Sequence, residues 1–185
     1  TVELLLDHDL PGDTAWISLE DFKAAGGTEE EYGEEGNNKY GPITALKHLK
    51  SATDSWNGVV TLTSADNVTG QNGSGDNYTI NYNGYKARLI SGQEIAAIAG
   101  DNEWTPDGDY IEGLPTWVYS NMAVNAEMEI TDVYEHAVYW TDSADAWDPL
   151  GAWDVNCDGN LTDYDVSTAY GSGVRPVVKI LKSNL

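Results

Sequence analysis

The spacing of apolar residues predicts a helix in the first third of the chain. Gly41 and Pro42 precede it, and Pro42 suits the first turn because proline lacks the N–H that a first turn leaves unbonded. An apolar stripe follows at helical spacing, formed by Leu46, Leu49, Ala52 and Trp56. Asn57 and Gly58 are expected to end the helix.

A second helix is predicted to begin at Ser91 or Gly92. Ser91 and Glu94 have the spacing of a capping box, in which each side chain bonds the backbone N–H of the other residue. Ile95 and Ile98 follow on one side of this helix, and we expect them to pack against the C-terminal strand.

Strands are predicted where apolar and polar residues alternate or form short apolar runs. These segments are residues 2–6, 59–62, 78–82 and 85–90, with Asn83-Gly84 as a hairpin turn between the last two. The polar stretches 28–38 and 64–77 are predicted to be loops. Helix signals precede residue 125 and strand signals dominate after residue 139, which predicts the α+β class.

The block from Tyr139 to Ile180 is predicted to contain a β-hairpin that turns at Asp158-Gly159. A two-residue turn places Trp153 opposite Tyr164 and Val155 opposite Thr162. Trp153 and Val155 then face the core. The same register places Asp154 opposite Asp163, a like-charge pair that a bound cation would relieve.

A calcium loop is the alternative for the same residues. Asp154, Asn156, Asp158 and Asp165 fall on ligand positions of an EF-hand loop, with Gly159 at its sharp turn. An EF-hand loop also needs a helix on each side, and Pro149 interrupts any helix before it. The alternative is a calcium-binding structural module.

The charge of the chain restricts its partners. The 185 residues include 31 acidic and 9 basic side chains, for a net charge of −22. Such a field opposes binding to nucleic acid. No apolar run reaches the length of a membrane span, so we expect no membrane insertion. The length suits a single domain.

A family resemblance is carried by two groups of residues. The first is the segment Ala87–Ile95, where an Arg-Leu stretch enters a helix with Glu94, although Ile90 stands where the family has proline. The second consists of Tyr139-Trp140-Thr141, Ala152-Trp153-Asp154 and Gly173-Val174-Arg175-Pro176. These residues resemble C-type-lectin-like domains of the formylglycine-generating-enzyme type, closest to bacterial surface proteins and to variable proteins of diversity-generating retroelements. The resemblance covers residues 85–182.

The resemblance implies a C-type-lectin-like fold with two main helices and a small antiparallel sheet, near-adjacent termini and a loop-rich face. The enzymes of this type use a copper ion bound by cysteines, and Cys157 is the only cysteine here, so their chemistry does not carry over. We therefore expect a non-enzymatic, receptor- or adhesin-type module without a cofactor, displayed outside the cell. Its signal or anchor would lie upstream of Thr1.

The binding face is predicted within residues 142–172, where side chains common on diversified surfaces are frequent. The candidate ligand-binding residues are Asp142, Ser143, Asp145, Trp147, Asp148, Asp163, Asp165, Ser167, Thr168 and Tyr170. Trp147 is predicted to be an exposed anchor, whereas Trp140 and Trp153 are predicted to be in the core. The expected ligand is a protein or glycan on another cell or particle, and a basic patch is favoured. Arg175 is expected to pair with a buried carboxylate, with Glu94 as the candidate.

Overall fold

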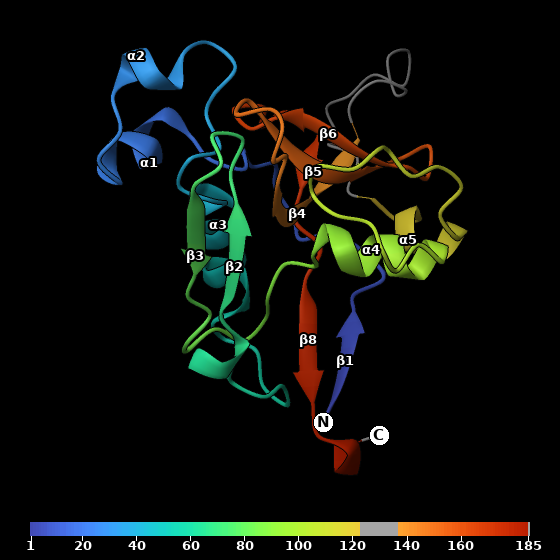
Figure 1. Cartoon of the computed structure of the whole chain (residues 1–185). Coiled ribbons are helices and arrows are strands. Elements are labelled where there is room, and N and C mark those ends of the chain that lie inside the picture. The colour runs from blue at the N-terminus through green and yellow to red at the C-terminus, as the bar shows by residue number, and fades with distance from the viewer. Residues whose placement is uncertain (123–136, 185) are drawn as a thin grey trace.

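The computed structural model describes residues 1–122 and 137–184 and has the predicted α+β class (Figure 1). Within this part of the chain, five α-helices precede the strands of the main sheet. They are α1 (Leu19–Ala24), α2 (Glu29–Tyr32), α3 (Ile43–Thr53), α4 (Gly92–Ala99) and α5 (Thr116–Tyr119).

The main sheet has four strands in the order β6-β5-β4-β7. These are β4 (Val138–Ala144), β5 (Gly151–Asn156), β6 (Leu161–Asp165) and β7 (Ser172–Gly173). β7 runs parallel to β4, and the other pairs are antiparallel. Successive side chains point to opposite faces of a strand, and each face of this sheet covers its own hydrophobic cluster.

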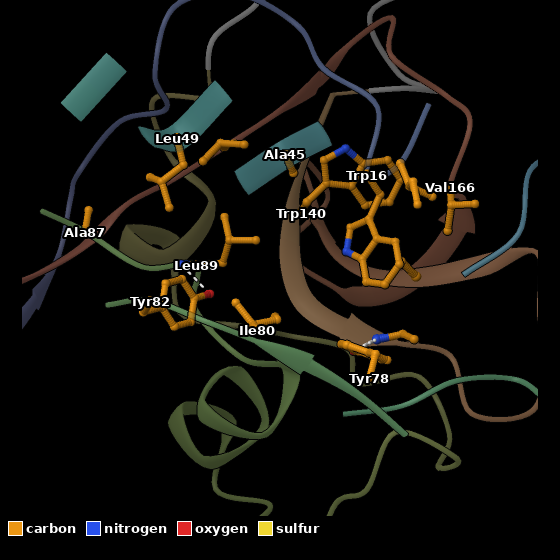
Figure 2. Close-up of a cluster of buried hydrophobic side chains, with 14 of the residues drawn as sticks. Trp16, Ala45, Leu49, Tyr78, Ile80, Tyr82, Ala87, Leu89, Trp140 and Val166 are labelled. Atoms are coloured by element: carbon orange, nitrogen blue, oxygen red, sulfur yellow. Dashed lines mark hydrogen bonds between the residues drawn. The ribbon is translucent and has the colours of Figure 1, made fainter. Parts of the chain in front are cut away.

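The larger cluster joins the sheet to the N-terminal segment. Trp16 and Trp140 are both fully buried there, together with Ala45 and Leu49 of α3 (Figure 2). The indole N–H of Trp16 donates to the carbonyl of Thr141, and that of Trp140 donates to the carbonyl of Thr14. The two indoles therefore satisfy their polar atoms while burying large apolar surfaces.

The hairpin predicted between residues 78–82 and 85–90 is not the one that forms. β3 (Asn77–Ile80) pairs with β2 (Val68–Gln71), inside the stretch predicted to be a loop, and not with residues 85–90. The side-chain oxygen of Asn72 accepts the N–H groups of Ser74 and Asp76 and so closes the turn between these strands. Residues 59–62 form no strand, although the N–H of Leu62 bonds the carbonyl of Tyr85.

The first and last strands pair with each other. β1 (Val2–Leu5) runs antiparallel to β8 (Val177–Ile180), which brings the two ends of the described chain to one side of the molecule (Figure 1). The capping box of α4 is confirmed, with Ser91 and Glu94 bonding each other's backbone N–H. Ile95 is fully buried in the cluster that contains Val177 of β8, and Ile98 packs against that cluster.

The hairpin in the C-terminal block is confirmed, but its predicted register is wrong by one residue. Trp153 lies opposite Asp163, and Asp154 lies opposite Thr162. The reason is a longer loop: the N–H of Asn156 donates to the carbonyl of Asn160, which leaves residues 157–159 in the turn, with Gly159 at a φ of 81°. Trp153 and Val155 are buried, as predicted.

The partner of Arg175 also differs from the prediction. Arg175 is fully buried and pairs with Asp9 at 2.8 Å, whereas Glu94 pairs with Arg88 at 2.6 Å. The Arg175 guanidinium also donates to the carbonyls of Val118 and Ser120. Among the described residues, no helix is long and apolar enough to cross a membrane.

Candidate functional site

The loop between β4 and β5 is held in place by side-chain hydrogen bonds. The carboxylate of Asp145 accepts the N–H groups of Trp147, at 2.6 Å, and of Asp148, at 3.1 Å. On the interior side of the loop, the amide nitrogen of Asn38 lies within 2.9 Å of the carbonyl oxygens of Asp145, Asp148 and Gly151. Asn38 is fully buried, so the loop rests on a fixed polar support.

Trp147 projects from this loop into solvent. Its side chain is 77% exposed, as the sequence predicted, although its indole N–H donates to the carbonyl of Asp107 at 2.8 Å. That bond fixes the orientation of the ring over the loop at residues 106–110. The indole is thus exposed and oriented at the same time.

Tyr110 is a second exposed aromatic residue, in the loop at residues 106–110 that Trp147 contacts, and it is 60% exposed. Its ring meets Trp153 edge-on at 5.8 Å, and its hydroxyl donates to the carboxylate of Asp163. This bond to Asp163 is the main cause that raises the pKa of Tyr110 to about 12. Trp153 in turn packs on Trp104, so a row of aromatic rings leads from the core to Tyr110.

Gly151 lets two carboxylates approach each other beside these rings. A Cβ atom at Gly151 would lie 2.9 Å from Oδ2 of Asp163 and 3.4 Å from Cβ of Asp145. Burial, and then the charges of Asp163 and Asp148, raise the pKa of Asp145. Asp145 itself is buried, contrary to the sequence-based expectation, because its carboxylate closes the loop. We use the name aromatic–acidic face for the surface formed by Tyr110, Trp147, Asp148, Asp163 and Asp165.

Asp165 belongs to this face through β6. It lies opposite Gly151 in the β5–β6 ladder. Burial raises the pKa of Asp165, and the nearby charges of Glu35, Asp148 and Asp163 add to the effect. The carboxylates on this face therefore repel one another, and a cationic group on a ligand would relieve the repulsion.

The remaining predicted residues lie elsewhere. Ser167 and Thr168 are partly buried in the turn after β6, where the N–H of Ser167 bonds the carbonyl of Glu35. Tyr170 is exposed but adjoins Gly171, whose carbonyl accepts the N–H of Val138 at the start of β4. Tyr170 and Trp147 are thus at opposite ends of β4, and the expectation that they share one surface is wrong.

Asp142 and Ser143 line a cleft instead of the exposed face. Asp142 is buried, contrary to the sequence-based expectation, because β4 carries it inward next to α4. Its carboxyl accepts the hydroxyl of Ser143, which itself accepts the N–H of Gly92. Burial, reinforced by the charge of Glu94, raises the pKa of Asp142 to about 7. The cleft has a volume of about 560 Å³ and also contacts β2.

The residues of the predicted calcium loop do not converge. Asp154 and Asp165 are eleven positions apart on paired strands and point to opposite faces of the hairpin, since Asp154 pairs with Thr162 and Asp165 pairs with Gly151. The side-chain oxygen of Asn156 accepts the N–H groups of Asp158 and Asn160 in the turn. Asp158 is exposed at the tip. Within residues 1–122 and 137–184, no group of three or more His, Cys, Asp or Glu side chains is placed to hold a metal ion.

Two residues that build the face were not predicted from the sequence. Asn38 lies at the end of an acidic stretch predicted to be a solvated loop, and Tyr110 lies in a loop rich in Gly and Asp. Neither position has a local signal, because each acts through contacts with residues far along the chain: Asn38 with the β4–β5 loop and Tyr110 with Asp163.

Comparisons with known proteins identify no relative: no family model, no curated protein and no solved structure matches the chain.

Proposed function

We propose that this protein is a non-enzymatic ligand-binding module of the receptor or adhesin type, and that the aromatic–acidic face is its binding surface. One observation carries the proposal. Trp147 and Tyr110 are exposed, and the polar atom of each ring is bonded to the protein, at Asp107 and Asp163. Exposed rings that are already oriented lose little conformational entropy when a ligand binds.

The support beneath the face favours recognition by a rigid surface. Asn38 fixes three carbonyls of the Trp147 loop, and Trp153 supports the ring of Tyr110. Because large exposed aromatic side chains dominate the energetics of many interfaces, the two rings serve as anchors and the carboxylates set the charge of the partner.

The ligand we propose is a protein or glycan that presents basic groups. Asp148, Asp163 and Asp165 give the face its charge, and the whole chain carries a net charge of −22. This field would attract a basic patch and repel an acidic one. It also supports our expectation that the chain does not bind nucleic acid.

The finer fold and the setting are part of the same proposal. We propose a C-type-lectin-like domain displayed on a surface, related to the variable proteins of diversity-generating retroelements. The pairing of β1 with β8 supports this assignment, because near-adjacent termini suit a domain presented from a stalk or a larger chain. The hairpin of β5 and β6 contributes Asp163 and Asp165 to the opposite, loop-rich end.

A binding screen at two ionic strengths tests the proposal. Labelled protein would be applied to an array of lysine- and arginine-rich peptides and to a glycan array at about 0.05 and 0.5 M salt. We expect basic probes to bind, and to be released at the higher ionic strength, where the Debye length is only several ångström. Failure to bind any basic probe at low salt would contradict the proposal.

A further inference from the structure

A groove is lined by residues of β1 and α4. β1 lies on the side of the molecule where the two ends of the described chain meet (Figure 1). The volume of the groove is about 520 Å³. One wall is β1, the other is formed by Ala97 and Ile98 of α4, and Trp117 of α5 lies at its rim. None of its lining residues belongs to the aromatic–acidic face.

The wall formed by β1 is an open strand edge. In β8, Val177 exchanges backbone hydrogen bonds with Arg88, and the carbonyl of Lys179 accepts the N–H of Val60. The backbone N–H and C=O groups of Val177 and Lys179 therefore point away from β1. Their partners in the ladder are Leu5 and Glu3. In an antiparallel ladder, two opposite residues that do not hydrogen-bond each other both direct their backbone N–H and C=O groups away from the partner strand. The N–H and C=O groups of Glu3 and Leu5 therefore point away from β8, and they bond no backbone group of the described chain.

Apolar surface accompanies this edge. Leu4 and Trp117 are 44% and 56% exposed, although both are large apolar side chains. The floor contains Ile90 and Val177 from the smaller core cluster. At one end of the groove, Arg88 bonds both Glu3 and Glu94 at 2.6 Å, so the charged groups there are already engaged with each other.

We propose that this groove binds an extended segment of another protein, which adds to β1 as a further strand. The open N–H and C=O groups of Glu3 and Leu5 match the backbone of an extended peptide, and alternate apolar side chains of that peptide would enter the space between Leu5, Ile98 and Trp117. The segment is free of acidic residues, because the chain around it carries a net charge of −22. The same charge opposes a second copy of this chain as the occupant.

A selection experiment tests the proposal. A phage-displayed library of linear nine-residue peptides would be selected on the immobilised full chain at about 0.5 M salt, where basic peptides are released from the aromatic–acidic face. The enriched peptides would be synthesised and titrated by fluorescence polarisation. We expect peptides that alternate apolar and small or basic residues. Trp117→Ala should weaken their binding at least tenfold. Trp147→Ala is the matched control, since it also removes one exposed indole, and it should leave their affinity within about twofold.

Backbone pairing has its own readout, which does not depend on any variant folding. Binding should slow hydrogen exchange at the amides of Glu3 and Leu5, while the amide of Leu4, which points toward β8, should change little. In an added strand, alternate peptide N–H groups face β1 and the others face solvent. N-methylation of the peptide at the first set should abolish binding, and N-methylation at the second set should preserve it.

Several results would overturn the proposal. They are a selection without enriched peptides, enriched peptides that bind equally well to Trp117→Ala, and unchanged exchange at Glu3 and Leu5 when peptide is bound. Self-association of the chain that Trp117→Ala removes would show that a second copy occupies the groove, which also contradicts the proposal.

Discussion

The carboxyl group of Asp142 lies buried beside the start of α4, where it accepts a hydrogen bond from Ser143. Burial raises its pKa to about 7, against about 3.9 for an exposed aspartate. The folded protein therefore holds a proton on Asp142 between these two pH values, and the unfolded chain does not. The stability that this group contributes is present below about pH 4 and is lost as the pH rises to about 7.

Asp142→Asn should remove this dependence, because asparagine keeps an acceptor for Ser143 and carries no charge. We expect the free energy of unfolding in urea to fall less between pH 4 and 7 in the variant, which should be the more stable protein at pH 8. Asp158→Asn, in the exposed turn, is the control and should follow the wild type. A variant less stable than the wild type at pH 8 would show that the ionised Asp142 is favourable.

Asn38 is the second residue with a testable role of its own. Asn38→Ala should lower the free energy of unfolding by at least about 2 kcal/mol, because it leaves buried carbonyls of the β4–β5 loop without their donor. Chemical denaturation measures this loss, and hydrogen exchange should show the loop at residues 145–150 opening. The neighbouring Asn37, which is only partly buried, supplies the control variant Asn37→Ala. Equal stability of the two variants would argue against the support role of Asn38.

At the scale of single elements, the cap of α4 gives a further prediction. Ser91→Ala removes the acceptor of the Glu94 N–H and should cost about 0.5–2 kcal/mol in the free energy of unfolding. Thr28→Ala removes the equivalent bond in the exposed four-residue helix α2 and should cost less, since α2 buries only Tyr32. An unchanged unfolding midpoint for Ser91→Ala would contradict the capping role.

The sequence predicts elements well where the signal is local. The capping box at Ser91 locates α4, and alternation around Asp158-Gly159 locates the β5–β6 hairpin. Predictions are wrong where a side chain sets the turn. The side chain of Asn72 accepts two backbone N–H groups and closes the loop of the β2–β3 hairpin, which was predicted to be a loop without strands. The side chain of Asn156 also accepts two backbone N–H groups, and the longer loop that it closes shifts the register of the β5–β6 hairpin by one residue.

At the scale of the whole molecule, Arg175 connects regions that are far apart along the chain. It bonds Asp9 near the N-terminus, the carbonyl of Val118 in α5 and the carbonyl of Ser120 just after α5. Its guanidinium lies 4.6 Å from the centre of the Tyr139 ring. The sequence indicated a structural arginine but not its partner. Nothing local distinguishes Asp9 from the other acidic residues, because only the completed fold brings Asp9 to Arg175.

Arg175→Met should be among the most destabilising single substitutions. It removes the cation that faces the buried carboxylate of Asp9, and such a change costs about 3–5 kcal/mol. Adding Asp9→Asn should recover part of this loss, which a double-mutant cycle from chemical denaturation would measure. A double variant as unstable as the sum of the two single variants would show that the pair is not coupled.

In the candidate site, too, features that depend on neighbouring residues could be predicted from the sequence, whereas features that depend on distant residues could not. The exposure of Trp147 could be predicted, because a tryptophan between aspartates in a loop has no local apolar partner. The inward position of Asp142 and the contribution of Tyr110 could not be predicted, because both depend on where distant segments pack. These contacts decide which carboxylates face solvent and therefore where a ligand could bind.

We propose that Trp147 and Tyr110 anchor a ligand on the aromatic–acidic face. The most direct test titrates the tightest-binding basic peptide from the array against the wild type, Trp147→Ala and Trp117→Ala. We predict at least tenfold weaker binding for Trp147→Ala, with an unfolding free energy within about 0.5 kcal/mol of the wild type, and unchanged binding for Trp117→Ala. Equal affinity of the wild type and Trp147→Ala for this peptide would show that Trp147 does not anchor the ligand.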